Sequence, residues 1–113
     1  MSNRNENSVQ IEVLKLQAEL CKSLSDPKRL YIIQELREGE RTVNELSEIL
    51  GIKQSNTSQH LAILRKTGII SPRKEGSTVY YKLVNPKIAV ACDLVHEVIA
   101  EHLRDSQRLS SLM

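Results

Sequence analysis

The residues from Lys53 to Lys66 combine many hydrogen-bonding side chains with no acid. The amides of Asn56 and Gln59 can each pair with adenine through two hydrogen bonds, and the cations of Lys53 and Arg65 suit phosphate groups. A merely solvated helix usually mixes Glu with Lys at helical spacing, and this stretch does not. The pattern therefore indicates a helix that contacts duplex DNA through Lys53, Gln54, Ser55, Asn56, Ser58, Gln59, His60, Arg65 and Lys66.

Charge is unevenly distributed along the chain, although the formal net charge is only +2. Five glutamates lie between residues 34 and 48, whereas the stretch from Ile49 to Lys74 holds five cations and no acid. A basic surface of this kind is typical of phosphate contact. Beyond it, Arg73, Lys74 and Ser77 flank a turn that we expect to reach the neighbouring minor groove. The alternative is an ordinary solvated turn.

Capping signals and apolar periodicity predict two helices before this region. Residues 9–24 carry an apolar stripe with helical spacing. Asp26 is a preferred N-cap residue, and Pro27 after it suits the first position of a helix, where its missing N–H costs nothing. A second helix therefore starts at this pair and ends at Gly39.

The next two helices are predicted to lie close together. Thr42 and Glu45 match a capping box, in which each side chain satisfies a free backbone donor of the other residue. A third helix therefore starts near Val43 and ends at Gly51, which can adopt a positive φ. Only a few residues separate this end from the amide-rich helix, which Gly68 ends. Two helices joined by a tight turn predict a helix-turn-helix.

After these helices the periodicity changes. Two β-prone runs, residues 69–73 and 78–83, flank a turn-rich tip at 74–77 and predict a hairpin, with Pro72 placing the first strand at an edge. Asn85 and the proline after it repeat the cap signal and start a long last helix. The fold class is mainly α with a β-hairpin: a winged helix-turn-helix in the order α-α-α-α-β-β-α.

The chain of 113 residues fits one domain. We expect a disordered tail at 1–8, a DNA-binding and dimerisation domain at 9–106, and a flexible tail at 107–113. Phe and Trp are absent, so the core must consist of Leu, Ile and Val, which leaves a small domain modestly stable on its own. The last helix has a broad apolar stripe formed by Ile88, Ala91, Cys92, Val95, Val98, Ile99 and His102. A homodimer would cover it.

Several classes of protein are excluded or disfavoured. No apolar run approaches the roughly 20 residues that cross a bilayer, and the polar start is unlike a signal peptide, so we expect no membrane partner and a cytoplasmic location. The chain lacks the usual phosphate-loop, nucleophile-elbow and zinc-protease motifs, which argues against an enzyme, and no cofactor is expected to be required. The remaining alternative is a winged-helix module that contacts only other proteins. An acidic or apolar fourth helix would favour that alternative, and this one is amide-rich.

Four segments of the chain resemble the ArsR/SmtB family of winged-helix repressors: residues 24–30 (LSDPKRL), 43–46 (VNEL), 55–70 (SNTSQHLAILRKTGII) and 75–81 (EGSTVYY). The resemblance extends over about residues 12–104, almost the whole chain. It implies a homodimer joined through the first and last helices, which binds an imperfect palindromic operator in double-stranded DNA. It also implies a repressor that leaves the operator when an inducer, often a metal ion or an oxidant, is sensed.

The metal sites of the family match this sequence poorly. Some members carry Cys-x-Cys in the third helix, where this chain has Ser47 and Glu48. Others use Asp-x-His followed by a second His motif on the last helix, whereas the spacing differs here for Asp93, His96 and His102. Thiol-switch members often have a cysteine in the second helix, at the position of Gln34 in this chain. The identity of an inducer, metal or metalloid, is thus open.

Two arrangements of cysteines could still sense a signal. Cys92 and His96 are four residues apart on the last helix, so both side chains can reach one metal ion. Cys21 and Cys92 lie on helices that the family packs together, so a pair of thiols could respond to oxidation or to a metalloid. In both cases the alternative is that the residues only pack, with a buried cysteine acting as a small apolar side chain.

Overall fold

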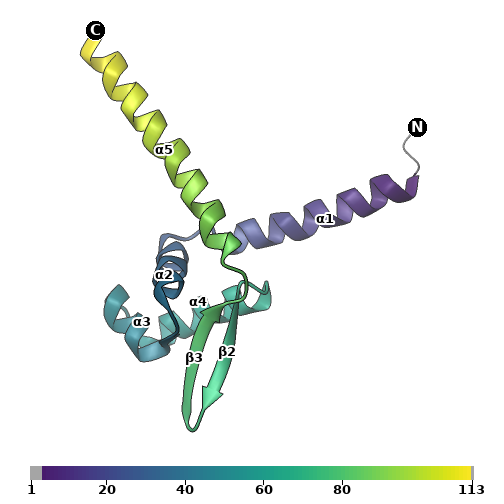
Figure 1. Ribbon diagram of the computed structural model, residues 1–113, viewed down its shortest axis with the longest axis vertical. Coiled ribbons are helices and arrows are strands. Elements are labelled where there is room, and N and C mark those ends of the chain that lie inside the picture. Colours follow the sequence, from purple (N-terminus) through teal and green to yellow (C-terminus); the bar gives the residue numbers. More distant parts are fainter. Residues whose placement is uncertain (1–3, 113) are drawn as a thin grey trace.

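The computed structural model describes residues 4–112 and has the predicted winged helix-turn-helix architecture (Figure 1). Its elements follow the expected order, with one additional short strand. They are α1 (Arg4–Ser23), α2 (Pro27–Glu38), β1 (Arg41–Thr42), α3 (Val43–Leu50), α4 (Gln54–Lys66), β2 (Ile70–Glu75), β3 (Thr78–Leu83) and α5 (Lys87–Leu112). The fold class predicted from the sequence is therefore confirmed.

Two helices project from a small compact core. Figure 1 shows α2, α3, α4 and the hairpin gathered together, while α1 and α5 leave them in different directions. The molecule measures 55 × 51 × 21 Å, and its radius of gyration is 18.1 Å. A compact domain of this length would have a radius of gyration of about 13 Å. One copy of the chain therefore leaves large parts of α1 and α5 without contacts to the core.

The core is made of aliphatic side chains, as the composition required. Side chains from α2, α3, α4, the start of β2 with the residue before it, and the first turn of α5 form one buried cluster: Ile32, Ile33, Leu36, Leu46, Leu61, Leu64, Ile69, Ile70 and Ala89. Among the described side chains of α1, Leu20 alone packs against this cluster, together with Leu24 just beyond the end of the helix. The core thus fixes the helix-turn-helix firmly and holds α1 only by its C-terminal end.

The predicted helix signals are present in the structure. The carboxylate of Asp26 accepts hydrogen bonds from the backbone N–H groups of Lys28 and Arg29 at the start of α2. Thr42 and Glu45 form the reciprocal hydrogen bonds of a capping box at the start of α3. Gly51 ends α3 with φ +66°, in the left-handed region that glycine adopts without steric cost. These three signals fix where α2 and α3 begin and where α3 turns into α4.

A buried pair of hydroxyls holds α3 against α4. Ser47 Oγ lies 2.8 Å from Thr57 Oγ1 and 2.8 Å from the carbonyl oxygen of Val43, and both side chains are buried. Thr57 Oγ1 also lies 3.3 Å from the carbonyl oxygen of Lys53. The hydrogen bond between these buried hydroxyls holds α3 and α4 at a fixed distance. Ser47, compared above with a metal-site thiolate, is therefore used in packing between the two helices.

The wing is a three-stranded sheet in the order β1-β3-β2. Strands β2 and β3 pair as the predicted hairpin, from Ile70 opposite Leu83 to Glu75 opposite Thr78, and Pro72 lies in the edge strand as expected. The strand β1 was not predicted, and its two residues pair with Tyr81 and Tyr80. Such a short strand has no periodicity of its own, and it forms only because β3 lies beside it.

The ends of the chain differ from the predicted tails. Residues 4–8 belong to α1, and residues 107–112 belong to α5, while residues 1–3 and 113 lie outside the described part. The sequence predicted a disordered tail at 1–8 and a flexible tail at 107–113, whereas the described residues of both segments are helical, because missing apolar periodicity indicates only that a segment lacks a packing face. Once a helix has formed, each further residue adds one hydrogen bond at little cost.

Two polar contacts set the position of α5. Asn85 Oδ1 accepts a hydrogen bond from the backbone N–H of Lys87, as the cap signal predicted. Arg37 on α2 makes a two-pronged ion pair with Asp93, with N–O distances of 2.8 and 2.6 Å. Two parallel hydrogen bonds fix the orientation of the Asp93 carboxylate relative to the Arg37 guanidinium as well as the distance between them. Within residues 4–112, no helix is both long and apolar enough to cross a membrane.

Candidate nucleic-acid interface

The helix α4 buries one face and exposes the other, as the sequence indicated. Thr57, Leu61 and Leu64 are buried against the core. The side chains predicted to contact DNA are exposed, apart from the half-buried His60: Lys53, Gln54, Ser55, Asn56, Ser58, Gln59, Arg65, Lys66, Arg73, Lys74 and Ser77. The structure therefore gathers the amide and hydroxyl groups of α4 on one accessible surface, which is the arrangement of a helix that enters a major groove.

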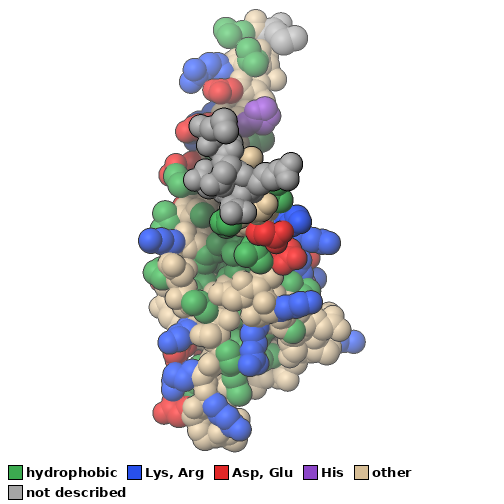
Figure 2. Space-filling model, turned by 90° about the vertical axis from the view of Figure 1, so that its right-hand side faces the viewer, with side chains coloured by type: hydrophobic (Ala, Val, Ile, Leu, Met, Phe, Trp, Pro, Cys, Tyr) green, Lys and Arg blue, Asp and Glu red, His purple; other side chains and the backbone are tan. Residues whose placement is uncertain are grey.

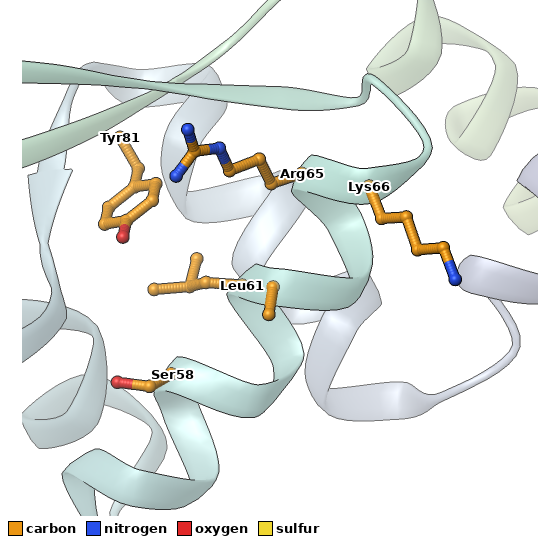
Figure 3. A pocket seen from close by; sticks show the side chains of 6 residues that line it. Ser58, Leu61, Arg65, Lys66 and Tyr81 are labelled. Atoms are coloured by element: carbon orange, nitrogen blue, oxygen red, sulfur yellow. The ribbon is translucent and has the colours of Figure 1, made fainter.

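A hollow of about 370 Å³ separates α4 from the wing. It is lined by Ser58, Leu61, Ala62, Arg65, Lys66 and Tyr81. In Figure 3 the side chains of Ser58, Arg65 and Tyr81 point toward this common space, while Lys66 points away from it. Two hydroxyls and a guanidinium are donors that suit a phosphate oxygen. Tyr81 was missed at the sequence level because nothing in a β-prone run shows which residue will face α4.

Gln54 is partly engaged inside the protein. Its side-chain nitrogen donates a hydrogen bond to Asn44 Oδ1, which joins the start of α4 to the first turn of α3. This bond uses one of the two N–H donors of the amide, so one N–H and the carbonyl oxygen have no internal partner among the hydrogen bonds of the described residues. Gln54 thus contributes to the helix-turn-helix geometry and keeps one donor and one acceptor for a base.

Arg73 is paired with acids, which the linear sequence did not suggest. Its guanidinium lies 2.7–3.0 Å from the carboxylate oxygens of Glu40, 3.0 Å from Glu75, and 4.9 Å from the centre of the Tyr80 ring. The hydrogen bonds from Arg73 lower the pKa of Glu40, so this carboxylate stays charged. A stretch without acids in the sequence is therefore not a surface without acids, because β1 and β3 bring Glu40 beside β2.

Cations nevertheless dominate the lower part of the molecule, which holds α4 and the hairpin. Figure 2 shows Lys and Arg side chains spread over this region with few acids among them, and apolar side chains exposed in the middle of the same view. Lys53, Arg65, Lys66 and Lys74 make no ion pair among the described residues. These four cations are available to phosphate, whereas Arg73 must break its ion pair with Glu40 before it can bind one.

Cys92, one of the two candidate sensing cysteines, lies in surroundings that do not favour a thiolate. Cys92 is half-buried, and burial together with the charge of Asp93 raises the pKa of its thiol. Asp93 itself is held by Arg37, whose hydrogen bonds lower the pKa of that carboxyl. Between residues 7 and 112 of one protomer, no three His, Cys, Asp or Glu side chains group as a metal site would require. Cys92 and His96 alone would supply only two ligands.

The cysteines lie near the place where α1 meets α5. Leu20 and Ile88 line one hollow of about 190 Å³ beside Gly68, so the end of α1 and the start of α5 are neighbours. Cys21 follows Leu20 directly and is exposed, while Cys92 lies one turn after Ile88. Both thiols are free in this structure.

Comparison with known proteins places these features in a family. The model described as "Bacterial regulatory protein, arsR family" matches residues 26–71, from the start of α2 into β2. The uncharacterized HTH-type transcriptional regulator Rv0081 of Mycobacterium tuberculosis is 38% identical over 92 residues, which cover 80% of this chain and 81% of that protein. The crystal structure of Rv0081 matches with a TM-score of 0.75 at 36% identity, over 83% of this chain and 95% of the other.

Two further relatives agree with this assignment. The transcriptional activator HlyU of Vibrio cholerae is 38% identical over 82 residues, covering 73% of this chain and 76% of HlyU. The homodimeric winged helix-turn-helix DNA-binding domain Mb0332 of Mycobacterium bovis matches with a TM-score of 0.78 at 30% identity, over 93% of each chain. The chain therefore belongs to the arsR family of bacterial regulatory proteins, winged helix-turn-helix transcriptional regulators that are not enzymes.

Proposed function

We propose that this protein is a homodimeric, sequence-specific repressor that acts in the bacterial cytoplasm and leaves its operator when an inducer is sensed. The observation that carries the proposal is the exposed, acid-free face of α4, with Asn56, Ser58 and Gln59 held by a helix-turn-helix. Amides and hydroxyls at the start of such a helix can read base edges, and the neighbouring cations can hold the phosphates.

The apolar faces of α1 and α5 support a dimer. Thirteen large apolar side chains among the described residues of these helices are more than half exposed: Val9, Ile11, Val13, Leu14 and Leu16 on α1, and Val90, Leu94, Val95, Val98, Ile99, Leu103, Leu109 and Leu112 on α5. Contiguous apolar surface of this kind marks an interaction site. A second copy of the chain is the partner we propose, since the similar domain Mb0332 is described as homodimeric. A two-fold dimer would read an imperfect palindrome with half-sites about 34–36 Å apart.

Occupancy of an operator that overlaps a promoter would be sufficient for the proposed repression. A dimer seated on two half-sites covers the DNA between them, so it can exclude RNA polymerase without any additional contact. HlyU is named as an activator, so family membership by itself does not set the direction of regulation. A reporter gene behind a selected operator would measure this direction.

The alternative function is a winged-helix module that binds only other proteins. It would use the same exposed face of α4 but would need no preference among DNA sequences. The four cations of α4, its N-cap and the wing that make no ion pair among the described residues favour DNA over this alternative: Lys53, Arg65, Lys66 and Lys74. The first test is therefore to select duplexes from a random pool with the wild-type protein and to ask whether one sequence is enriched.

The first prediction separates base readers from phosphate contacts. On the selected duplex, Gln59→Ala should reduce the preference over unrelated DNA by about 1–3 kcal/mol, because one two-pronged base contact is lost. Lys53→Ala should instead weaken binding to all duplexes and reduce the slope of log affinity against log salt by about one. Titrations at several salt concentrations measure both effects. Arg104→Ala, which removes a cation from the projecting part of α5, is the matched control. Unchanged preference in Gln59→Ala would contradict a base-reading role for this residue.

The second prediction concerns the pairing of Arg73 in the wing. Glu40→Gln removes the carboxylate that holds Arg73, so DNA affinity should rise and the salt slope should steepen by about one phosphate contact. Glu97→Gln, which removes the same charge from α5, should change neither quantity by as much. Adding Arg73→Ala to Glu40→Gln should abolish the gain. An equal gain in DNA affinity for Glu40→Gln and Glu97→Gln would mean that only net charge matters, and that Arg73 does not reach the DNA.

For the inducing signal we propose Cys21 and Cys92, which lie on the neighbouring ends of α1 and α5. Bridging these thiols, by oxidation or by a metalloid, would pull on the helices that set the spacing of the two copies of α4. A coupling of about 1–3 kcal/mol would be enough for induction. Operator affinity of the wild-type protein should fall with trivalent arsenic or an oxidant, whereas Cys21→Ser and Cys92→Ser should not respond. An identical response in all three proteins would show that these cysteines only pack.

A further inference from the structure

The side chain of Arg29 connects α2 with both α1 and α4. It lies in the first turn of α2, where its backbone N–H is capped by Asp26. Its side-chain Nε donates a hydrogen bond of 2.6 Å to the carbonyl oxygen of Ser23, the last residue of α1. Its Nη1 lies 3.2 Å from Nδ1 of His60, in the middle of α4. One half-buried guanidinium therefore contacts both the projecting helix and the DNA-reading helix.

The chemistry of this contact defines the state of His60. A guanidinium has only donors, and it stays protonated in proteins. The Nδ1 atom of His60 must therefore be the acceptor, so it carries a lone pair and the ring proton lies on Nε2. His60 then offers an N–H donor from Nε2, which suits a phosphate oxygen or the acceptors of guanine. The reverse tautomer would place two donors against each other.

The end of α1 is tied to α4 at a second point. Thr67, just after α4, donates a hydrogen bond of 3.1 Å from its hydroxyl to Ser23 Oγ. Ser23 is 4% exposed, and its own hydroxyl lies 2.6 Å from the carbonyl oxygen of Leu20. By contrast, residues 7–19 of α1 are all exposed in one protomer. The contacts of Ser23 and the packing of Leu20 and Leu24 are thus what sets the direction of α1.

We propose that Arg29 is a positioning residue for DNA recognition: it fixes the Nε2–H tautomer of His60 and, with Thr67, holds α4 at a set angle to α1. Since α1 spans 20 residues, or about 30 Å, a small rotation at Ser23 becomes a large displacement at the dimer partner. The same clamp then sets the separation of the two copies of α4. The part on half-site spacing rests on the proposed function, whereas the tautomer assignment does not.

The tautomer is tested in the full-length protein without DNA. Spectra of ¹⁵N-labelled histidine at about pH 8, where histidine side chains are generally neutral, distinguish the two tautomers. The chain has three histidines, so the signal of His60 is the one lost in His60→Asn. Wild type should show Nε2–H at His60, and Arg29→Gln should show a mixture of tautomers. Arg37→Lys, which alters the other paired arginine of α2, is the control and should leave His60 unchanged. Persistence of pure Nε2–H in Arg29→Gln would overturn the assignment.

The positioning role is tested on duplexes whose half-sites are moved apart by one base pair. Wild type should bind the altered duplex about 5- to 150-fold more weakly than the selected one. Arg29→Lys keeps the charge but lacks the planar guanidinium that reaches both Ser23 and His60. The ratio of its affinities for the selected and the altered duplex should therefore be at least severalfold smaller than that of wild type. Thr67→Val should also reduce it while leaving the tautomer of His60 intact, and thermal unfolding confirms that both variants are folded. Full discrimination in both folded variants would overturn the positioning role. If wild type selects no duplex, the proposed function fails, and the histidine spectra still decide the assignment.

Discussion

The apolar surface that α1 and α5 present to solvent is the constraint on which the rest of this structure depends. Val13 and Leu16 on α1, and Val95 and Ile99 on α5, are each more than half exposed in one protomer. Apolar surface is worth about 25 cal/mol per Å² when it is removed from water, so these helices gain far more from a partner than from projecting alone. The compact core contributes the helix-turn-helix, and the projecting helices decide how two such cores are placed. DNA recognition needs both, because a palindrome is read only when two copies of α4 have a fixed separation.

Polar contacts connect these two parts of the molecule. Arg37 holds the start of α5 through Asp93, and Arg29 holds the end of α1 through the carbonyl oxygen of Ser23. Both arginines lie on α2, which is also packed into the core through Ile32 and Ile33. The central helix α2 therefore links the direction of both projecting helices to the position of α4. A signal that strains either projecting helix would reach the DNA-reading face by this route.

Much of the fold was predictable because its signals are local. The N-cap at Asp26, the capping box that begins at Thr42, and the change of periodicity after Gly68 each depend on a few neighbouring residues, and each is confirmed. The strand β1 and the pairing of Arg73 with Glu40 depend on residues far apart in the chain, so no local pattern could show them. The same holds for the candidate site. The exposed residues of α4 follow from its period, whereas Tyr81 and the hydrogen bond from Arg29 to His60 appear only when the chain is folded.

The most direct test of this account is the mass of the protein in solution. Sedimentation of the wild-type chain at micromolar concentration should give a single species of twice 12.8 kDa. Val95→Asp would place an unpaired charge in the apolar face of α5, at a cost of several kcal/mol, and should abolish this species. Glu97→Gln, an exposed change on the same helix, should leave the dimer intact. A folded wild-type monomer under these conditions would contradict the central claim that α1 and α5 are covered by a second copy of the chain.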